Sequence, residues 1–177
     1  MLFRSLSLSK SAKNTLNIED KIQTLGKDFA NSKGSMFLGR GYSYPIALEG
    51  ALKLKELAYV HAEGYPAGEM KHGPLALIEE GMPVVVIAPR DEHYKKTISN
   101  MQEVISRGAK VLLITNKSTD EIYSENIWEQ IEVDAISDEL IPFLTTIPLQ
   151  KLAYYSALDK GYDIDKPRNL AKSVTVE

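Results

Sequence analysis

Cysteine is absent from this sequence of 177 residues. The absence excludes disulfide bonds, thiolate metal sites and a cysteine nucleophile, and it is typical of the reducing cytoplasm, where we expect the protein. No apolar run approaches the roughly 20 residues of a membrane-spanning helix, because the longest one, 83–89, is short and bounded by prolines. Positive charge is not in excess either, since 21 Lys and Arg residues stand against 24 Asp and Glu residues. We therefore expect neither nucleic acid nor a membrane surface as a partner.

The composition, with 44% hydrophobic and 25% charged residues, is typical of one packed globular domain. The first 18 residues differ from the rest, because they are rich in serine, carry only basic charges and form no sustained apolar stripe. We interpret residues 1–18 as a linker or an added N-terminal segment, and residues 19–177 as the domain.

Short β-branched runs alternate with longer helical patterns from Met36 onward, as is typical of a parallel sheet covered by helices. The predicted strands are Met36–Gly39, Val84–Ala88, Val111–Thr115 and Ile131–Val133. The predicted helices are Glu19–Ser32, Pro45–Val60, Pro74–Glu80, Glu92–Arg107 and Ile141–Leu158. The fold class that this pattern predicts is α/β.

A glycine-rich turn, Gly39-Arg40-Gly41, follows the first predicted strand and leads into a helix. The turn fits a ligand loop, because a helix N-terminus favours an anion, and it fits a plain strand-to-helix connection equally well. Tyr44 stands where a dinucleotide fingerprint has its third glycine, which argues against a nucleotide ligand.

The helix after that turn carries Glu49, Lys53 and Glu56 on one stripe, because these residues are four and three positions apart. One interpretation is a solvated ladder of ion pairs, each worth about 0.2–0.5 kcal/mol. The other interpretation is a proton-transferring carboxylate that is tuned by a neighbouring ammonium group.

Residues 61–74 are dense in glycine, proline and ionisable groups, as functional loops often are. A metal is not expected, because the spacing of Glu69 and His72 occurs once and lacks the further carboxylates of a di-metal site. His72 is either a general acid or base, or a histidine that caps the break at Gly73.

The C-terminal residues 165–177 include apolar side chains around Lys172, which indicates a segment held against the domain. Lys172 is then either an ordinary surface lysine or a partly desolvated, nucleophilic amine. The residues themselves leave both interpretations open.

Four stretches together, 39–41, 47–56, 68–76 and 167–177, resemble the glutamine–fructose-6-phosphate aminotransferase family. The likeness runs from about Asp20 to the last residue and matches the second of the two sugar isomerase (SIS) domains of that family. It implies a three-layer α/β/α sandwich around a flavodoxin-like or Rossmann-like parallel sheet of about five strands. It also implies an enzyme that works without a cofactor or a metal.

The resemblance assigns roles to individual residues. Lys172 matches the lysine that forms a Schiff base with the open-chain ketose, and Glu56 matches the carboxylate that moves a proton between the first two carbons. His72 matches a histidine that assists ring opening from the neighbouring subunit of a homodimer. Lys53 matches a catalytic lysine near the reacting end of the sugar, and Lys53, Ala171 and Lys172 are the implied sugar contacts. The implied partners are fructose 6-phosphate, glucosamine 6-phosphate and a second copy of the chain.

The chain also departs from the family. It has neither the glutaminase cysteine that releases ammonia nor the Ser/Thr-rich phosphate loop of a first isomerase domain, so it resembles a C-terminal fragment that we expect to be inactive alone. Gly64 and Pro66 stand where relatives commonly carry alanines. Two alternatives are a non-catalytic module that binds a sugar phosphate, such as the sensor domain of a transcriptional regulator, and a structural dimerisation fragment. A sensor needs no imine-forming lysine, so Lys172 favours the enzyme over the sensor.

Overall fold

The computed structural model describes residues 2–116 and 126–168. In these residues five strands form one fully parallel sheet in the order β2-β1-β3-β4-β5. The strands are β1 (Ser35–Gly39), β2 (Ala62–Pro66), β3 (Pro83–Ile87), β4 (Lys110–Asn116) and β5 (Glu129–Val133). This is the strand order of the flavodoxin-like fold, so the expected α/β class and sheet type are confirmed.

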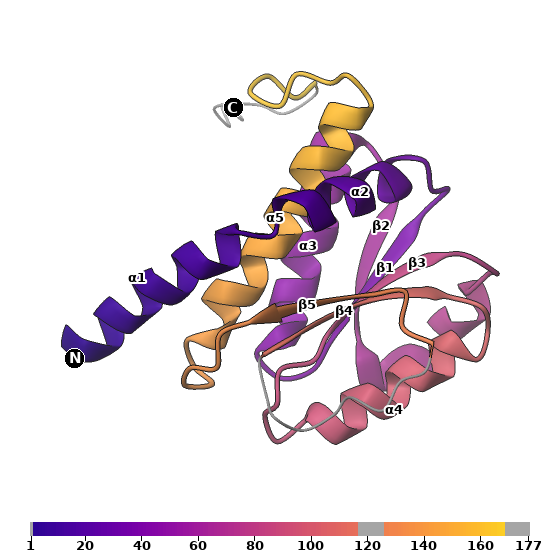
Figure 1. Cartoon of the computed structure of the whole chain (residues 1–177). Helices are drawn as coiled ribbons and strands as arrows, with labels where there is room; N and C mark the ends of the chain where they lie inside the picture. Colours follow the sequence, from indigo (N-terminus) through magenta and orange to yellow (C-terminus); the bar gives the residue numbers. More distant parts are fainter. Residues whose placement is uncertain (1, 117–125, 169–177) are drawn as a thin grey trace, which may run out of the picture.

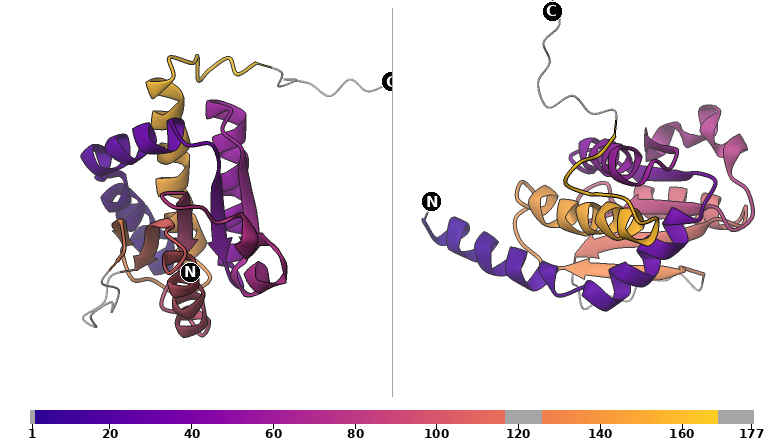
Figure 2. Two further views of the ribbon diagram at one scale, coloured as in Figure 1. Left: turned by 90° about the vertical axis from the view of Figure 1, so that its right-hand side faces the viewer. Right: turned by 90° about the horizontal axis from the view of Figure 1, so that it is seen from above.

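Helices cover both faces of the sheet (Figure 1 and Figure 2). One layer contains α2 (Glu19–Ala30), α3 (Ser43–Ala58) and α5 (Ile141–Asp159). The other contains α4 (Tyr94–Ile105) and a short 3-10 helix, η1 (Ala67–His72), which a second 3-10 helix, η2 (Pro74–Leu77), follows. The expected three-layer sandwich is therefore confirmed.

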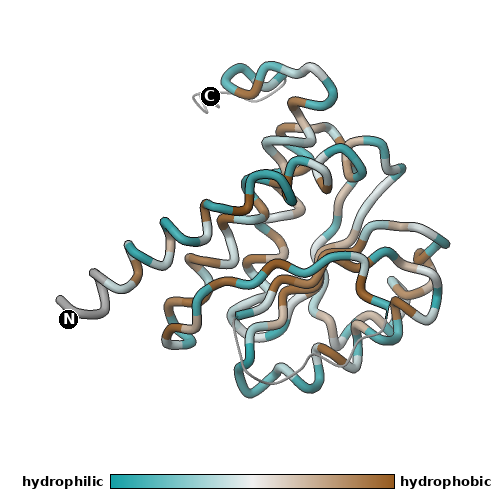
Figure 3. The backbone as a smooth tube through the Cα atoms, in the orientation of Figure 1, coloured by the Kyte–Doolittle hydropathy of each residue, from teal (hydrophilic) through white to brown (hydrophobic). Residues whose placement is uncertain are grey.

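Each face of the sheet has its own apolar core, because successive residues of a strand point to opposite faces. In β3, Val85 packs in the layer of α2, α3 and α5, while Val86 packs in the layer of α4. All five residues of β3 are buried, as expected for a central strand covered on both sides. Figure 3 shows the hydrophobic segments gathered in the central strands, between more polar helix surfaces.

The strand β2 lies within residues 61–74, which the sequence pattern predicts to be an irregular loop. Gly64 and Pro66 make β2 hard to recognise in the sequence, because glycine and proline are rare inside strands. Pairing with β1 alone creates the strand, and its position at the sheet edge tolerates a proline. The helix predicted over 74–80 is also shorter than expected, since only Pro74–Leu77 is helical.

The N-terminal segment, interpreted as a linker, forms a helix, α1 (Leu2–Leu16), that extends away from the sheet (Figure 1). Its second half touches α5 and β5 through small polar side chains: Ser11 and Thr15 are buried, and Asn14 Nδ2 donates to Asp134 Oδ2 at 2.7 Å. Because this helix buries polar rather than apolar side chains, it has no apolar stripe from which it could be predicted.

Candidate functional site

The charged stripe of α3 runs from the middle of the helix to its last turn. The Lys53 ammonium donates to Glu56 Oε2 at 2.7 Å and lies 3.6 Å from Glu49 Oε1. The side chains of Lys53 and Glu56 are 30% and 25% exposed, so the pair is half-buried and still open to a ligand. The ion-pair ladder predicted from the spacing therefore exists, and it presents an accessible carboxylate at its end.

The two carboxylates determine the protonation of the lysine. The hydrogen bond to Glu56 is the main cause that raises the pKa of Lys53 above its ordinary value, and the charge of Glu49 acts in the same direction. Lys53 therefore remains an ammonium group at neutral pH. It can stabilise negative charge, but it is a poor nucleophile, because attack on a carbonyl requires the neutral amine.

The C-terminal segment is anchored at the end of α3 that carries Glu56. The backbone N–H of Arg168 donates to the Tyr59 hydroxyl at 2.7 Å, and the Arg168 guanidinium lies 4.1 Å from the centre of the Tyr59 ring. Tyr59 caps α3 in a left-handed conformation, and Lys160 donates to the carbonyl of Ala58. The end of the described chain thus contacts a residue that is about one helical turn after Glu56.

His72 lies on the other face of the sheet. Glu56 is in the last turn of α3, which packs in the layer of α2 and α5, whereas His72 is the last residue of η1, which packs with α4 on the opposite face. The His72 side chain is 75% exposed, and its nearest charged neighbour is Glu69 at 3.9 Å. Within one chain, therefore, the fold does not bring His72 and Glu56 together.

Ala171 and Lys172, the remaining predicted site residues, lie outside the described residues. The structure thus brings together Glu56 and Lys53 and separates both from His72. The role of Tyr59 as an anchor for the tail was not predicted. Its only sequence signal is an aromatic residue directly after the helix, which is common in any protein.

The glycine-rich turn of residues 39–41 is a tight connection. A Cβ atom on Gly39 would lie 2.3 Å from the Ser43 carbonyl oxygen, and Gly41 has a φ of +52° against the ring of His93. The Arg40 guanidinium points to α4, where it donates to Asn100 Oδ1 at 3.0 and 3.2 Å. Arg40 is therefore bound within the protein rather than directed at the loop.

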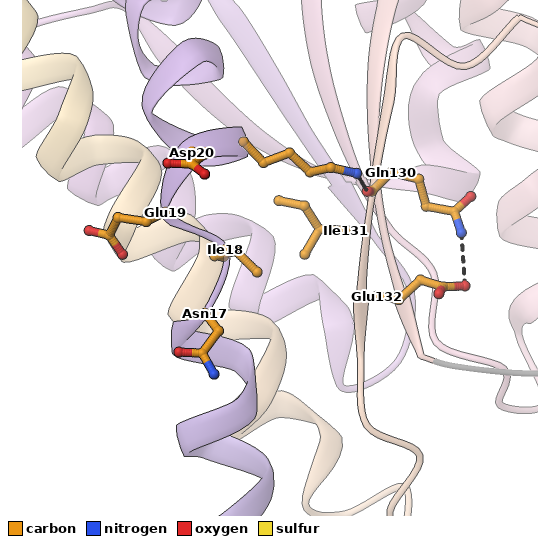
Figure 4. A pocket seen from close by; sticks show the side chains of 8 residues that line it. Asn17, Ile18, Glu19, Asp20, Gln130, Ile131 and Glu132 are labelled. Carbon is orange, nitrogen blue, oxygen red and sulfur yellow. Dashed lines mark hydrogen bonds between the residues drawn. The ribbon is translucent and has the colours of Figure 1, made fainter.

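A hollow of about 690 Å³ lies between the α1–α2 junction and the edge strand β5 (Figure 4). It contains carboxylates and amides around Ile18 and Ile131, and Glu19 is held by Lys151 and Tyr155, which lower its pKa. The α3 helix packs on β1 and β2, which lie at and next to the opposite edge of the sheet from β5. This hollow is therefore separate from the Glu56 site.

A second hollow, about 550 Å³, lies at the carboxyl ends of the strands, where open α/β sheets commonly bind ligands. Its lining includes Asp91, Glu92 and Asp138 beside His93. These carboxylates repel a phosphate group, so the hollow does not fit an anionic sugar.

The described residues contain no group of three or more His, Asp or Glu side chains placed to hold a metal ion. No helix in residues 2–116 or 126–168 has the length and apolarity needed to cross a lipid bilayer.

Comparison with known families gives one match over most of the chain: residues 28–159 match the SIS domain. The matched range contains the sheet and the helices α3, α4 and α5, including Lys53, Glu56 and His72.

Curated relatives and a solved structure carry the comparison further. The chain is 52% identical over 162 residues to the glutamine–fructose-6-phosphate aminotransferase (isomerizing) of Bartonella quintana, and 53% identical over 171 residues to that of Bacteroides thetaiotaomicron. These alignments cover 92% and 97% of this chain but only 27% and 28% of the relatives. The C-terminal domain of glucosamine-fructose-6-phosphate aminotransferase from Francisella tularensis superposes with a TM-score of 0.86 at 44% identity, over 90% of this chain and 45% of that one.

Proposed function

The chain belongs to the SIS domain family, and on that premise we propose that it is the C-terminal isomerase part of a glutamine–fructose-6-phosphate aminotransferase. Its reaction would convert fructose 6-phosphate and ammonia derived from glutamine into glucosamine 6-phosphate, in the cytoplasm and without a cofactor. Residues 19–177 would form the second SIS domain and residues 1–18 the connection to preceding domains. The length of the relatives supports this arrangement, because this chain spans little more than a quarter of them.

One observation carries the proposal beyond the family: the anchored tail and Glu56 share one end of α3. Lys172 is four positions after Arg168, and an extended chain advances at most about 3.6 Å per residue. The amine of Lys172 therefore has the end of α3 within its reach. A carboxylate and an amine at one place are the two groups that an imine-based isomerisation needs.

The proposed chemistry proceeds in balanced steps. The neutral Lys172 amine attacks the C2 carbonyl of the open-chain ketose, and loss of water gives an imine. Ammonia adds to C2 and displaces the lysine amine, which leaves an imine of ammonia. The Glu56 carboxylate then takes the proton from C1 and returns it to C2, while the C1 hydroxyl loses its proton and the imine nitrogen gains one, so that C1 becomes the aldehyde and C2 carries the amine.

Lys53 would act on charge rather than as a nucleophile. Its ammonium group lies 2.7 Å from Glu56, and its raised pKa keeps it charged while the proton moves. A fixed positive charge at this point stabilises the oxygen that becomes negative in the enolamine. This division of labour assigns the Schiff base to Lys172 rather than to Lys53.

The position of His72 supports a site shared between two copies of the chain. If His72 assists ring opening, it must meet the Glu56 of another subunit, because the two lie on opposite faces of one sheet. We therefore expect the isolated chain to be a homodimer in sedimentation experiments across micromolar concentrations. Exposed Leu48 and Leu52, one turn apart on α3, offer apolar surface for such a contact. A clean monomer over the whole concentration range would contradict this prediction.

The chain alone should not make glucosamine 6-phosphate from glutamine. It has no cysteine to release ammonia and no Ser/Thr-rich phosphate loop. Charge-assisted hydrogen bonds to phosphate are worth about 1.5–3 kcal/mol each, so the loss of several weakens sugar binding by orders of magnitude. Product formation assayed with the pure chain and glutamine tests this prediction. Robust synthesis under these conditions would overturn the division of function between domains.

For experiments on catalysis we define the assembled enzyme as the Bacteroides thetaiotaomicron aminotransferase in which this chain replaces the matching segment. The matching segment is 53% identical to this chain over 171 residues.

A further inference from the structure

The 3-10 helix η1 carries His72, but its own backbone gives it little stability. It has only six residues, and 3-10 helices of this length have poor hydrogen-bond geometry. On its buried side, Ala67 and Met70 pack in the core shared with α4. Two apolar contacts bind η1 to the domain, but they do not determine how it is rotated or how far it slides along α4.

Two polar contacts with α4 fix the rotation of η1 and its position along α4. Asn100 and Glu103 are three positions apart and therefore share one face of α4. Glu103 Oε1 receives the Lys71 ammonium at 2.9 Å, and Lys71 is the residue directly before His72. The other oxygen, Oε2, is buried and has no hydrogen-bond partner among the described residues. Among the described residues, Lys71 is thus the group that compensates the negative charge of the Glu103 carboxylate.

The second contact runs through Arg40. Its guanidinium is held by two hydrogen bonds to Asn100, whose side chain is buried, and it lies directly against Gly68 of η1. A Cβ atom on Gly68 would lie 2.6 Å from the Arg40 Nη2 atom, so a larger residue here would displace the guanidinium. Arg40 therefore fixes the start of η1 while Glu103 fixes its end.

We propose that Arg40, Asn100 and Glu103 are positioning residues that lock η1 onto α4, so that His72 reaches the neighbouring subunit's site in one fixed orientation. The proposal rests on the proposed role of His72 in ring opening. It explains two features together. The His72 side chain is largely exposed, and the helix that carries it is fixed to the domain by polar contacts.

The test combines the assembled enzyme with two substrates. Fructose 6-phosphate must open its ring, whereas 5-deoxyfructose 6-phosphate lacks the hydroxyl that closes the furanose and is always open. Glu103→Lys places two positive charges together and displaces the end of η1. A misplacement of about 1 Å can cost up to about 100-fold, so we expect turnover of fructose 6-phosphate to fall about 10- to 100-fold while the 5-deoxy sugar reacts normally.

Three further variants separate positioning from general damage. Adding Lys71→Glu to Glu103→Lys restores opposite charges and should restore the rate with fructose 6-phosphate. Adding Glu103→Lys to His72→Ala should cost nothing more, because both changes act through one imidazole. The matched control is Lys21→Glu, which disrupts the comparable ion pair with Glu129 on another part of the domain and should leave both rates unchanged.

The outcomes distinguish the two levels of the proposal. If His72→Ala turns over fructose 6-phosphate at the normal rate, the role of His72 fails, and the positioning proposal fails with it. If His72→Ala is slow and Glu103→Lys is normal, or if Glu103→Lys is slow with both sugars, only the positioning proposal is overturned. Hydrogen exchange of the amides of η1 in the chain itself gives an activity-independent measure: Glu103→Lys should accelerate it, and unchanged exchange would contradict the lock.

Discussion

Replacing Glu56 by glutamine in the assembled enzyme should lower turnover by about 10²–10⁴-fold, because it removes a positioned general base. The amide keeps the shape and one acceptor oxygen, so Lys53 retains a partner at the same place. Sugar binding should change far less than turnover, since the lost interaction is expressed in the transition state. The measurement is the transfer of a C1 hydrogen label to solvent or to C2 under saturating fructose 6-phosphate.

The matched control for this prediction is Glu49→Gln. Glu49 lies on the same stripe and interacts with the same ammonium group, but at 3.6 Å and about two turns further from the anchored tail. We expect Glu49→Gln to retain a rate near that of the unmodified enzyme. If Glu56→Gln also transfers the label at the normal rate, Glu56 is only one member of the surface ion-pair ladder.

Replacing Lys172 by arginine should abolish the covalent adduct that borohydride traps with fructose 6-phosphate. A guanidinium remains protonated in proteins and cannot become the neutral amine that forms an imine. The measurement is the mass of the intact protein after reduction, followed by identification of the modified peptide. The adduct should be on the peptide that contains Lys172 in the unmodified enzyme and be absent in the variant.

Lys53→Arg is the corresponding control. Because its two carboxylate neighbours raise the pKa of Lys53, this residue is charged at neutral pH and should not carry the adduct. Trapping should therefore survive in Lys53→Arg, although turnover should fall. An adduct that persists in Lys172→Arg and disappears in Lys53→Arg would reverse the assignment of the nucleophile.

The elements that could be predicted from the sequence are those that local pattern determines. The apolar run of β3 and the amphipathic pattern of α4 are visible in the sequence, because burial on both faces or on one face fixes the residue types. In contrast, β2 exists only through pairing with β1, and α1 buries small polar groups rather than an apolar stripe. Both were missed because their stability comes from partners distant in the sequence.

The candidate site also has one part that local sequence spacing predicts and one part that only tertiary packing determines. The spacing of Glu49, Lys53 and Glu56 correctly predicted one charged stripe, because helical periodicity is local. The position of His72 on the other face of the sheet depends on the packing of η1 against α4, and the contacts of Arg40 with α4 and η1 also depend on tertiary packing. No spacing along the chain encodes either of these relations.

A mixing experiment tests most directly the central claim, that two copies of the chain build each isomerase site. Glu56→Gln and His72→Ala subunits of the assembled enzyme, each nearly inactive alone, are unfolded, mixed in equal amounts and refolded together. If His72 serves the neighbouring subunit, each mixed dimer contains one site with both residues intact, and random pairing restores about a quarter of the normal activity. If both residues act within one subunit, the mixture stays as inactive as its two components, and that result would contradict the account.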